Sequence, residues 1–300
     1  MRWRAVWVVA GIAAAAPLHG QSLGPRAYSP NPTGANFAIA NYGYQTGSVL
    51  LDPSIPIENV DAKINNAALG YVRTFGLFGR SASAALVVPY VWGSLEGDVA
   101  EERRKITRSG FGDLQTRFAV NLLGGPARTP KEFAAAPPAT TLGFSLVTVA
   151  PTGEYLPDKL INISAHRWAF KPEIGVSHPA GRWTFEAYAG AWFFTTNDDF
   201  FGGKVRTQDP IVAFQAHVSY QFLPRLWLAA SGTYYTGGQS TIDGVKSVDL
   251  EKNSRVSLTA SVPIAQRQSL KFFFARGATT SIGADFTTYS VTYQILWFDR

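Results

Sequence analysis

Residue types that catalyse reactions or bind metals are scarce in this chain of 300 residues. It contains four His and no Cys, so it offers neither disulfides nor metal sites built on thiolates. His19 belongs to an apolar segment at the N-terminus, His166 to a predicted loop and His178 to a predicted turn. We therefore predict no metal site and no cofactor.

The one arrangement that suggests catalysis is His217-Val218-Ser219. Side chains two residues apart on a strand point to the same side, so the imidazole could deprotonate the hydroxyl. This pair shares its face with the polar Gln215 and Gln221, while Val218 lies on the opposite, apolar face. We expect His217 to be a hydrogen-bonded histidine on a polar face, and we predict no catalytic residues and no enzymatic activity.

Acidic residues suggest a second kind of site between residues 197 and 203. Asn197, Asp198 and Asp199, followed by Gly202-Gly203, could offer carboxylate and backbone oxygens to Ca²⁺. The segment lacks the regularly spaced ligands of a dedicated calcium loop. A solvated turn is the simpler interpretation, and no metal ligand is predicted there.

The N-terminus has the features of an export signal. Arg2 and Arg4 precede an apolar stretch, Ala5 to Ala16, which is too short for a membrane-spanning helix of about 20 residues. We predict a signal peptide over residues 1–20, cleaved after Gly20, and hence an exported mature chain.

The mature chain alternates apolar and polar residues in segments near the 9–11 residues expected of a barrel strand. Phe118 and Val120, for example, share one face, while Gln115 and Arg117 share the other. Strands are predicted at 35–45, 64–74, 81–92, 112–122, 140–150, 168–177, 183–194, 211–222, 226–236, 254–262, 269–276 and 286–297.

The connectors fall into two alternating classes. Those after the odd strands are long and polar, at 47–62, 93–110, 152–167, 195–210 and 237–253, and those after the even strands are short, at 76–80, 178–182, 223–225 and 263–268. Long loops outside and short turns in the periplasm are typical of outer-membrane barrels. The long connector 123–139, rich in Pro and Ala, breaks the rule and predicts either a periplasmic flap or a slip in register.

Composition favours a closed barrel. The chain is 46% hydrophobic with 20 Phe, 12 Tyr and 8 Trp, yet no apolar run beyond the signal peptide reaches the length of a membrane helix, so a membrane protein of this kind must be a closed barrel. Aromatic residues gather at strand ends, where interfacial girdles are expected, at Tyr42, Tyr44, Tyr90, Trp92, Trp168, Phe170, 192–194, Phe222, Trp227, Trp297 and Phe298.

The predicted fold class is therefore all-β, a single antiparallel transmembrane β-barrel of about twelve strands over residues 35–300. Residues 21–34 are predicted to be a short periplasmic N-terminal segment, and the location to be the outer membrane. The last strand alternates from Tyr289 to Trp297 and resembles the terminal signal read by the outer-membrane assembly machinery, although Asp299 and Arg300 follow it.

The charge balance bears on partners. There are 27 basic and 21 acidic residues, a net charge of +6, spread over predicted loops, so no nucleic-acid partner is expected. The run 101–105 is predicted to be a charged outer loop, with contact to lipopolysaccharide phosphates as a second interpretation. Expected partners are membrane lipid, lipopolysaccharide, the assembly machinery and a small-molecule solute.

Five segments resemble an outer-membrane β-barrel family labelled phenol-degradation meta-pathway protein, whose members are often called transporters. They are RAYSPNPTGANFAIANYGY from Arg26, DAKINNAALGYVRTFGLFGR from Asp61, RSGFGDLQTRFAVNLLGGPA from Arg108, APTGEYLPDKLINISAHRWAFKPEIGVS from Ala150 and WTFEAYAGAWFFTTNDDFFGG from Trp183. The resemblance covers most of the mature chain. It implies a barrel fold, an outer-membrane location and solute transport, and it carries over no catalytic residues.

The predicted polar face of the barrel holds the candidate functional residues. The lumen-lining candidates are Asp113, Gln115, Arg117, Asn121, Lys171, Glu173, Glu186, Gln215, His217 and Arg255. Charged groups enclosed in a barrel must pair or be hydrated. They line a path for small, aromatic or anionic solutes in a channel or transporter, or they form a plug in a structural or anchoring barrel.

Two further alternatives are a lipid hydrolase of the outer membrane, from the His217 and Ser219 pair, and a hydrocarbon channel with lateral diffusion. Channels of the second kind have a sizeable N-terminal hatch in the lumen, whereas here only Gln21 to Gly34 precede the first predicted strand. We therefore expect no hatch.

Overall fold

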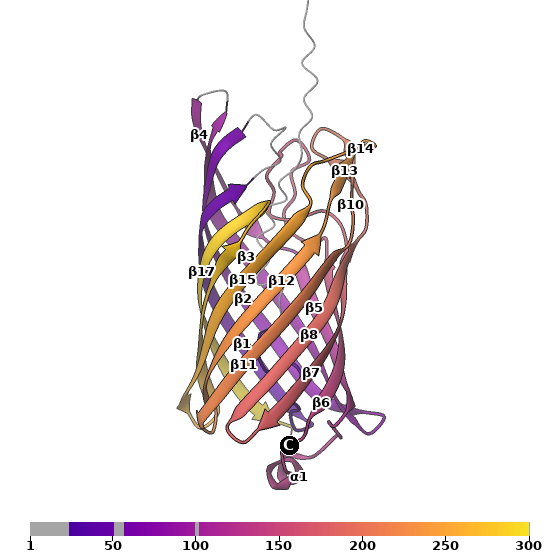
Figure 1. Cartoon of the computed structure of the whole chain (residues 1–300), viewed down its shortest axis with the longest axis vertical. Coiled ribbons are helices and arrows are strands. Elements are labelled where there is room, and N and C mark those ends of the chain that lie inside the picture. Colours follow the sequence, from indigo (N-terminus) through magenta and orange to yellow (C-terminus); the bar gives the residue numbers. More distant parts are fainter. Residues whose placement is uncertain (1–23, 51–56, 100–101, 300) are drawn as a thin grey trace, which may run out of the picture.

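A computed structural model describes residues 24–50, 57–99 and 102–299. The predicted signal peptide, residues 1–20, lies outside the described residues. The main sheet contains thirteen strands and closes on itself (Figure 1). Because β4 and β5 both pair with β3, at its two ends, they share one position in the wall. Thirteen strands less this one duplication give twelve positions, which confirms the prediction of a closed antiparallel barrel.

The wall consists of strands that run up and down in chain order. They are β1 (Ala35–Leu50), β2 (Ile57–Leu77), β3 (Arg80–Val99), β4 (Glu102–Phe111) with β5 (Leu114–Leu123), β6 (Thr141–Ala150), β7 (Ala169–Ala180), β8 (Trp183–Phe194), β11 (Ile211–Leu223), β12 (Leu226–Gly237), β15 (Glu251–Ala265), β16 (Gln268–Thr279) and β17 (Gly283–Phe298). No helix among the described residues is long and apolar enough to cross a membrane.

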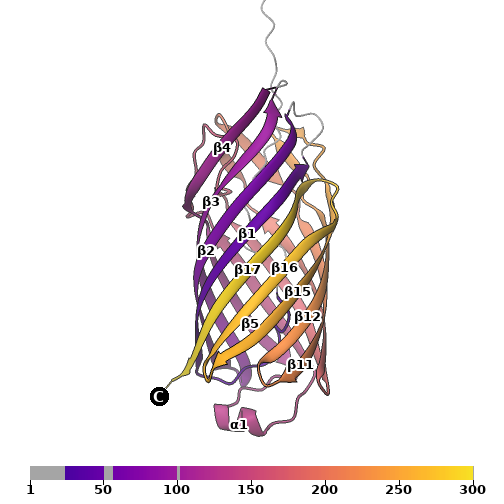
Figure 2. The same cartoon turned by 90° about the vertical axis from the view of Figure 1, so that its left-hand side faces the viewer.

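The barrel closes where the first strand pairs with the last, from Ala35 opposite Phe298 to Leu50 opposite Gly283. Figure 2 shows β1 and β17 side by side at this seam. Asp299 secures the end of the seam, because its backbone N–H donates to the Gly34 carbonyl at 2.9 Å and its carboxylate accepts from Asn36 at 2.9 Å. Arg73 on β2 binds the same carboxylate at 2.8 Å.

Alternation along each strand separates an apolar outer face from a polar inner face. Phe118 and Val218 are each 39% exposed, whereas their strand neighbours Ala119 and His217 are buried. Exposed apolar side chains on the outer face include Leu69, Leu86, Val88, Leu146, Ile174, Val176, Val212, Phe214, Leu228, Val256, Leu258 and Phe272. An apolar exterior on a closed barrel is the surface that a lipid bilayer solvates.

Aromatic rings collect near both ends of this apolar belt. Tyr90 packs edge-on against Phe111 at 5.3 Å towards one end, and Tyr71 lies 6.1 Å from Trp297 towards the other. Three aromatics predicted for the girdles do not belong to them. Trp192 and Trp227 are 6% and 7% exposed, and the half-buried Phe194 lies against the Arg167 guanidinium. All three point inward because their positions fall on the polar phase of the alternation in β8 and β12.

The short turns predicted after the even strands all lie at one end, which is periplasmic by the asymmetry of such barrels. The connector 123–139 also lies there and contains helix α1 (Pro130–Ala135), at the bottom of Figure 1. Thr129 caps this helix, and its hydroxyl and the Glu132 side chain form a capping box, with Pro130 at the start. The pairing of β5 with β6 runs from Leu114 opposite Ala150 to Leu123 opposite Leu142, with a register shift between Asn121 and Leu123. The connector therefore forms a flap, and the register also shifts by one residue where it begins.

At the extracellular end the strands continue well past the membrane. β2 has 21 residues and β3 has 20, about twice what a bilayer crossing requires. The predicted loops 47–62 and 93–110 are thus partly strand, and 195–210 and 237–253 form a separate small sheet of β9 (Asn197–Phe200), β10 (Lys204–Gln208), β13 (Ser240–Ile242) and β14 (Val245–Lys246). The parts of these strands beyond the membrane lie in water, so their outer faces carry charged side chains and lack the apolar residues that face lipid.

Candidate functional site in the barrel lumen

The lumen-lining candidates all lie on the inner phase of their strands. Asp113, Asn121, Lys171, Glu173, Glu186, Gln215 and His217 are buried, and Gln115, Arg117 and Arg255 are half-buried. Side chains of both signs are therefore enclosed in the barrel, where each charge requires a partner.

The N-terminal segment before β1 enters the lumen and occupies its periplasmic half. Tyr28 is 2% exposed. Its hydroxyl lies 2.8 Å from the Ser145 hydroxyl on β6 and donates to the Glu173 carboxylate on β7 at 3.1 Å. The segment was expected to be too short for a hatch, yet it lies inside the barrel and contacts the wall through Arg26 and Tyr28.

Two glycines in the wall make room for the Tyr28 ring. A Cβ on Gly143 would lie 2.4 Å from Cδ1 of that ring, and a Cβ on Gly175 would lie 2.2 Å from Cε2. Both contacts are far shorter than side chains tolerate. The wall and the N-terminal segment are therefore complementary in shape at this point.

Arg26 anchors the same segment to the neighbouring strands of the wall. Its backbone N–H donates to the Glu186 carboxylate at 2.6 Å. Its guanidinium donates to Ser219 at 3.3 Å and to Gln221 at 3.1 Å, and it lies 4.9 Å from the centre of the Trp227 ring. These contacts join the segment to β8, β11 and β12.

A buried ion pair lies beside Tyr28. Lys171 Nζ is 2.5 Å from a Glu173 carboxylate oxygen, and the two side chains are 2% and 0% exposed. Gln215 Nε2 donates to the same carboxylate oxygen at 2.9 Å. The Arg117 guanidinium lies 5.3 Å from the Tyr28 ring and donates to the Ala27 carbonyl at 3.4 Å. Predicted lumen residues thus hold the N-terminal segment.

His217 and Ser219 do not form a nucleophile and base pair. His217 Nδ1 lies 2.8 Å from the Ser231 hydroxyl on β12, and the Ser219 hydroxyl accepts from Arg26. Both residues face the lumen and are buried. The two side chains have separate partners, so the geometry lacks the contact on which serine hydrolysis depends.

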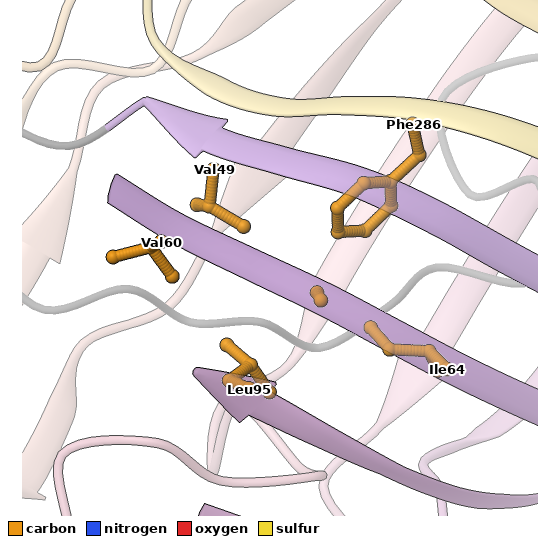
Figure 3. Close-up of a cluster of buried hydrophobic side chains, with 6 residues drawn as sticks. Val49, Val60, Ile64, Leu95 and Phe286 are labelled. Carbon is orange, nitrogen blue, oxygen red and sulfur yellow. The ribbon is translucent and has the colours of Figure 1, made fainter. Parts of the chain in front are cut away.

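The loop between β6 and β7, residues 151–168, folds over the extracellular mouth. Asp113 holds it, accepting from the Ser164 hydroxyl at 2.6 Å and from the backbone N–H groups of Gly153 and Ala165 at 3.0 and 3.2 Å. Ile161 of this loop packs on an apolar cluster that lines the inside of β1, β2, β3 and β17 (Figure 3). Asp113 therefore anchors a loop.

Two arginines lie in the extracellular half of the lumen, and each is 6% exposed. Arg167, at the end of the loop, donates to Gln208 of β10 and lies 4.4 Å from the Phe194 ring centre. Arg206, also on β10, lies 5.4 Å from the Phe200 ring centre. Burial and the neighbouring Arg206 charge lower the pKa of Arg167 to about 9, so it stays protonated at neutral pH.

Several of these functional residues were not among the sequence candidates. Arg26 and Tyr28 precede the first strand, and Arg167 and Arg206 lie in long connectors, where period-two alternation gives no signal. A usable signal was the pair of glycines, Gly143 and Gly175, at inner positions of neighbouring strands, where a missing side chain leaves space for another group.

Residues 197–203, interpreted from the sequence as a solvated turn, instead contain strand β9 of the extracellular sheet. Asn197 donates to the Tyr155 hydroxyl at 3.1 Å and to the Ala165 carbonyl at 3.1 Å. Among residues 24–50, 57–99 and 102–299, no group of three or more His, Cys, Asp or Glu side chains could hold a metal ion.

A closed antiparallel barrel with an apolar belt, aromatic girdles and a polar interior defines a transmembrane protein of the outer-membrane type. Residues 29–297 match the family described as "Putative MetA-pathway of phenol degradation". The chain belongs to this family.

Solved structures share the fold. An outer membrane channel from Pseudomonas putida F1 is 20% identical and superposes with a TM-score of 0.78 over 92% of this chain and 100% of the other. The beta domain of the Bordetella autotransporter BrkA is 11% identical, with a TM-score of 0.52 over 88% and 100% of the two chains. The transport unit of the autotransporter AIDA-I from Escherichia coli is 8% identical, with a TM-score of 0.50 over 89% and 90%. None of the curated proteins matches the chain.

Proposed function

We propose that this protein is an outer-membrane channel for small solutes, with a path through the polar lumen that the N-terminal segment narrows at its periplasmic end. The observation that supports it best is the inner face, where charged groups from Asp113 to Arg255 line the barrel along its length. If the barrel served only as an anchor or a structural element, apolar side chains would fill its interior better, because buried charges cost free energy that they rarely return in full.

The shared fold adds to this proposal. The protein from Pseudomonas putida F1 is described as an outer membrane channel, and it spans nearly the whole of this chain. We assign no catalytic role to His217 or Ser219, since each has a different partner. Membrane lipid, lipopolysaccharide and the outer-membrane assembly machinery are the proposed partners of the outer surface and the last strand.

A structural barrel with a sealed lumen is the second candidate. It is favoured by the dense contacts of Arg26 and Tyr28 with four strands of the wall. The two functions differ in what removing these contacts does. In a channel, freeing the segment widens the path, whereas in a structural barrel it only weakens the fold.

Single-channel conductance in planar bilayers tests the proposal. We expect the refolded mature chain to conduct weakly, and the double variant Arg26→Ala/Tyr28→Ala to conduct more, because both contacts that hold the segment in the lumen are lost. Tyr42→Ala is the matched control, since Tyr42 lies on the outer face and is 45% exposed. Absence of conductance in both the wild type and the double variant would refute the channel.

A further inference from the structure

Donor groups without acceptors gather in the extracellular half of the lumen. Arg167 Nη1, Arg206 Nε and Trp192 Nε1 are buried and have no hydrogen-bond partner among the described residues. An unsatisfied buried donor is costly, and such groups are rare in folded proteins unless they serve a ligand, water or ion.

The three groups belong to one cluster. Arg206 lies on β10, and Arg167 of the loop binds Gln208 on the same strand. Gln208 lies two residues from Arg206 and hence on the same face of β10. Arg167 stacks over Phe194, and Phe194 lies 6.5 Å from Trp192 with nearly parallel rings. The cluster joins the loop, the small extracellular sheet and the barrel wall.

The charge in this cluster is not balanced at Arg167. No carboxylate among the described residues lies within ion-pair distance of Arg167, and its charged neighbour is the like-charged Arg206. The carboxylates of Asp249 and Glu251 act on Arg206. A buried guanidinium that faces another cation favours a ligand of opposite charge.

Apolar side chains surround the cations. Trp192 belongs to a buried cluster with Val147, Ala169, Ile211, Ala213 and Tyr235, and Phe194 packs against it. An ion such as chloride or phosphate would use the cations only, whereas an organic anion would also use these rings and methyl groups. Lipopolysaccharide phosphates lie outside the barrel, and both guanidinium groups are enclosed within it.

We propose that Arg167 and Arg206 form a recognition site for a small organic carboxylate with an apolar body, at the extracellular end of the lumen. The planar guanidinium matches the two oxygens of a carboxylate, and the Trp192 and Phe194 rings receive the apolar body. The inference rests on the proposed channel function and names the class of solute that the channel admits.

Calorimetric titration of the refolded, full-length mature chain in detergent tests the site. The probes are benzoate, benzyl alcohol as its neutral counterpart, acetate as an anion without an apolar body, and inorganic phosphate. We expect benzoate to bind and the other three to bind more weakly. Arg167→Gln and Arg206→Gln should each weaken benzoate binding by about 10- to 100-fold, as expected for a lost charge-assisted contact.

Arg104→Gln is the matched control, because Arg104 lies outside the lumen with a side chain that is 64% exposed, and we expect it to leave binding unchanged. Arg167→Lys keeps the charge but loses the planar pair of donors, so it should fall between the wild type and Arg167→Gln. Heat-modifiable gel migration shows that each variant is folded. Equal binding of benzoate and benzyl alcohol, or equal benzoate binding by wild type and Arg167→Gln, would overturn the site.

Conductance separates this inference from the proposed function. If the protein conducts but does not bind benzoate, the solute class is wrong and the channel stands. If it binds benzoate through Arg167 but does not conduct, the site stands and the channel is refuted. If benzoate lowers the wild-type current and not that of Arg167→Gln, both are supported.

Discussion

In the half of the lumen that holds the N-terminal segment, Lys171 and Arg26 each have a carboxylate nearby, whereas in the half towards the extracellular mouth Arg167 has another arginine instead. Lys171 pairs with Glu173, and Arg26 lies beside Glu186. Arg167 and Arg206 lie together. The two halves share a wall and similar residue types, so the difference lies in how the charges are paired.

This difference in charge pairing indicates which residues stabilise the fold and which are available to bind a solute. A paired charge contributes to the stability of the barrel, and removing one partner leaves the other buried and unpaired. An unpaired charge costs stability, and its retention points to a role outside folding. Substitutions in the two halves should therefore change stability in different ways.

Lys171→Gln should have the largest effect. It leaves the Glu173 carboxylate in a buried site without its cation, which costs about 3–5 kcal/mol of unfolding free energy for a truly buried pair. The measurement is the denaturation midpoint of the refolded barrel in detergent. Lys105→Gln is the control, because Lys105 binds Glu96 at 2.6 Å but is 58% exposed, and no measurable change is expected. Equal loss in both variants would show that the lumen pair is hydrated.

Phe118→Arg tests the apolar outer face of the barrel, which surrounds both halves of the lumen. Phe118 is 39% exposed on the apolar belt, and an Arg near the bilayer midplane costs about 2–4 kcal/mol. We expect reduced assembly into lipid vesicles, measured by the heat-modifiable fraction on gels. Gln115→Arg, on the half-buried inner face, should assemble better, and similar damage from both would mean that the faces are exchanged.

Tyr28→Phe tests the half of the lumen that holds the N-terminal segment. The ring still fits against Gly143 and Gly175, but the hydroxyl contacts with Ser145 and Glu173 are lost. Leaving these groups partly unsatisfied costs about 1–3 kcal/mol. Tyr42→Phe, which loses a hydrogen bond to Asn65 on the exposed outer face, provides the comparison in the same unfolding experiment. An unchanged midpoint for Tyr28→Phe would mean that water replaces the hydroxyl.

Arg167→Met should have the smallest effect on stability, or raise it. The substitution removes a buried charge that has no carboxylate partner, and Met fills similar apolar space beside Phe194. The unfolding midpoint should match or exceed that of the wild type. A loss comparable to that of Lys171→Gln would contradict the distinction between the two halves.

The wall of the barrel could be predicted from the sequence because period-two alternation is strong wherever one face meets lipid. The pairs Phe118 with Arg117, and Val218 with His217, place adjacent residues on opposite faces, as expected. The strands were predicted too short at the extracellular end. There the outer face meets water, so charged residues such as Glu96 and Arg103 continue the backbone pairing without an apolar outer face to signal it, while the inner face carries apolar residues such as Leu95.

The candidate site was predicted only where it lies on strands. Lys171, Glu173 and Gln215 follow from alternation, and the structure brings them together. Arg26, Tyr28, Arg167 and Arg206 lie in segments without a period. Their positions depend on contacts that span 41 residues of sequence, between Arg167 and Gln208, to 195 residues, between Arg26 and Gln221. Such contacts are set by the closed wall and leave no local trace.

The seam held by Asp299 has a consequence for the order of assembly. It joins residues as far apart as Asn36 and Asp299, which are separated by 263 positions, so loop-closure entropy and high contact order make it a late step. Tyr28 contacts β6 and β7, on the far side of the barrel from that seam. We therefore expect the N-terminal segment to settle on a still-open sheet before the ends join. We expect cysteines at the paired positions Asn36 and Trp297 to cross-link only after Tyr28 has become buried. Cross-linking before the burial of Tyr28 would disprove this order of events.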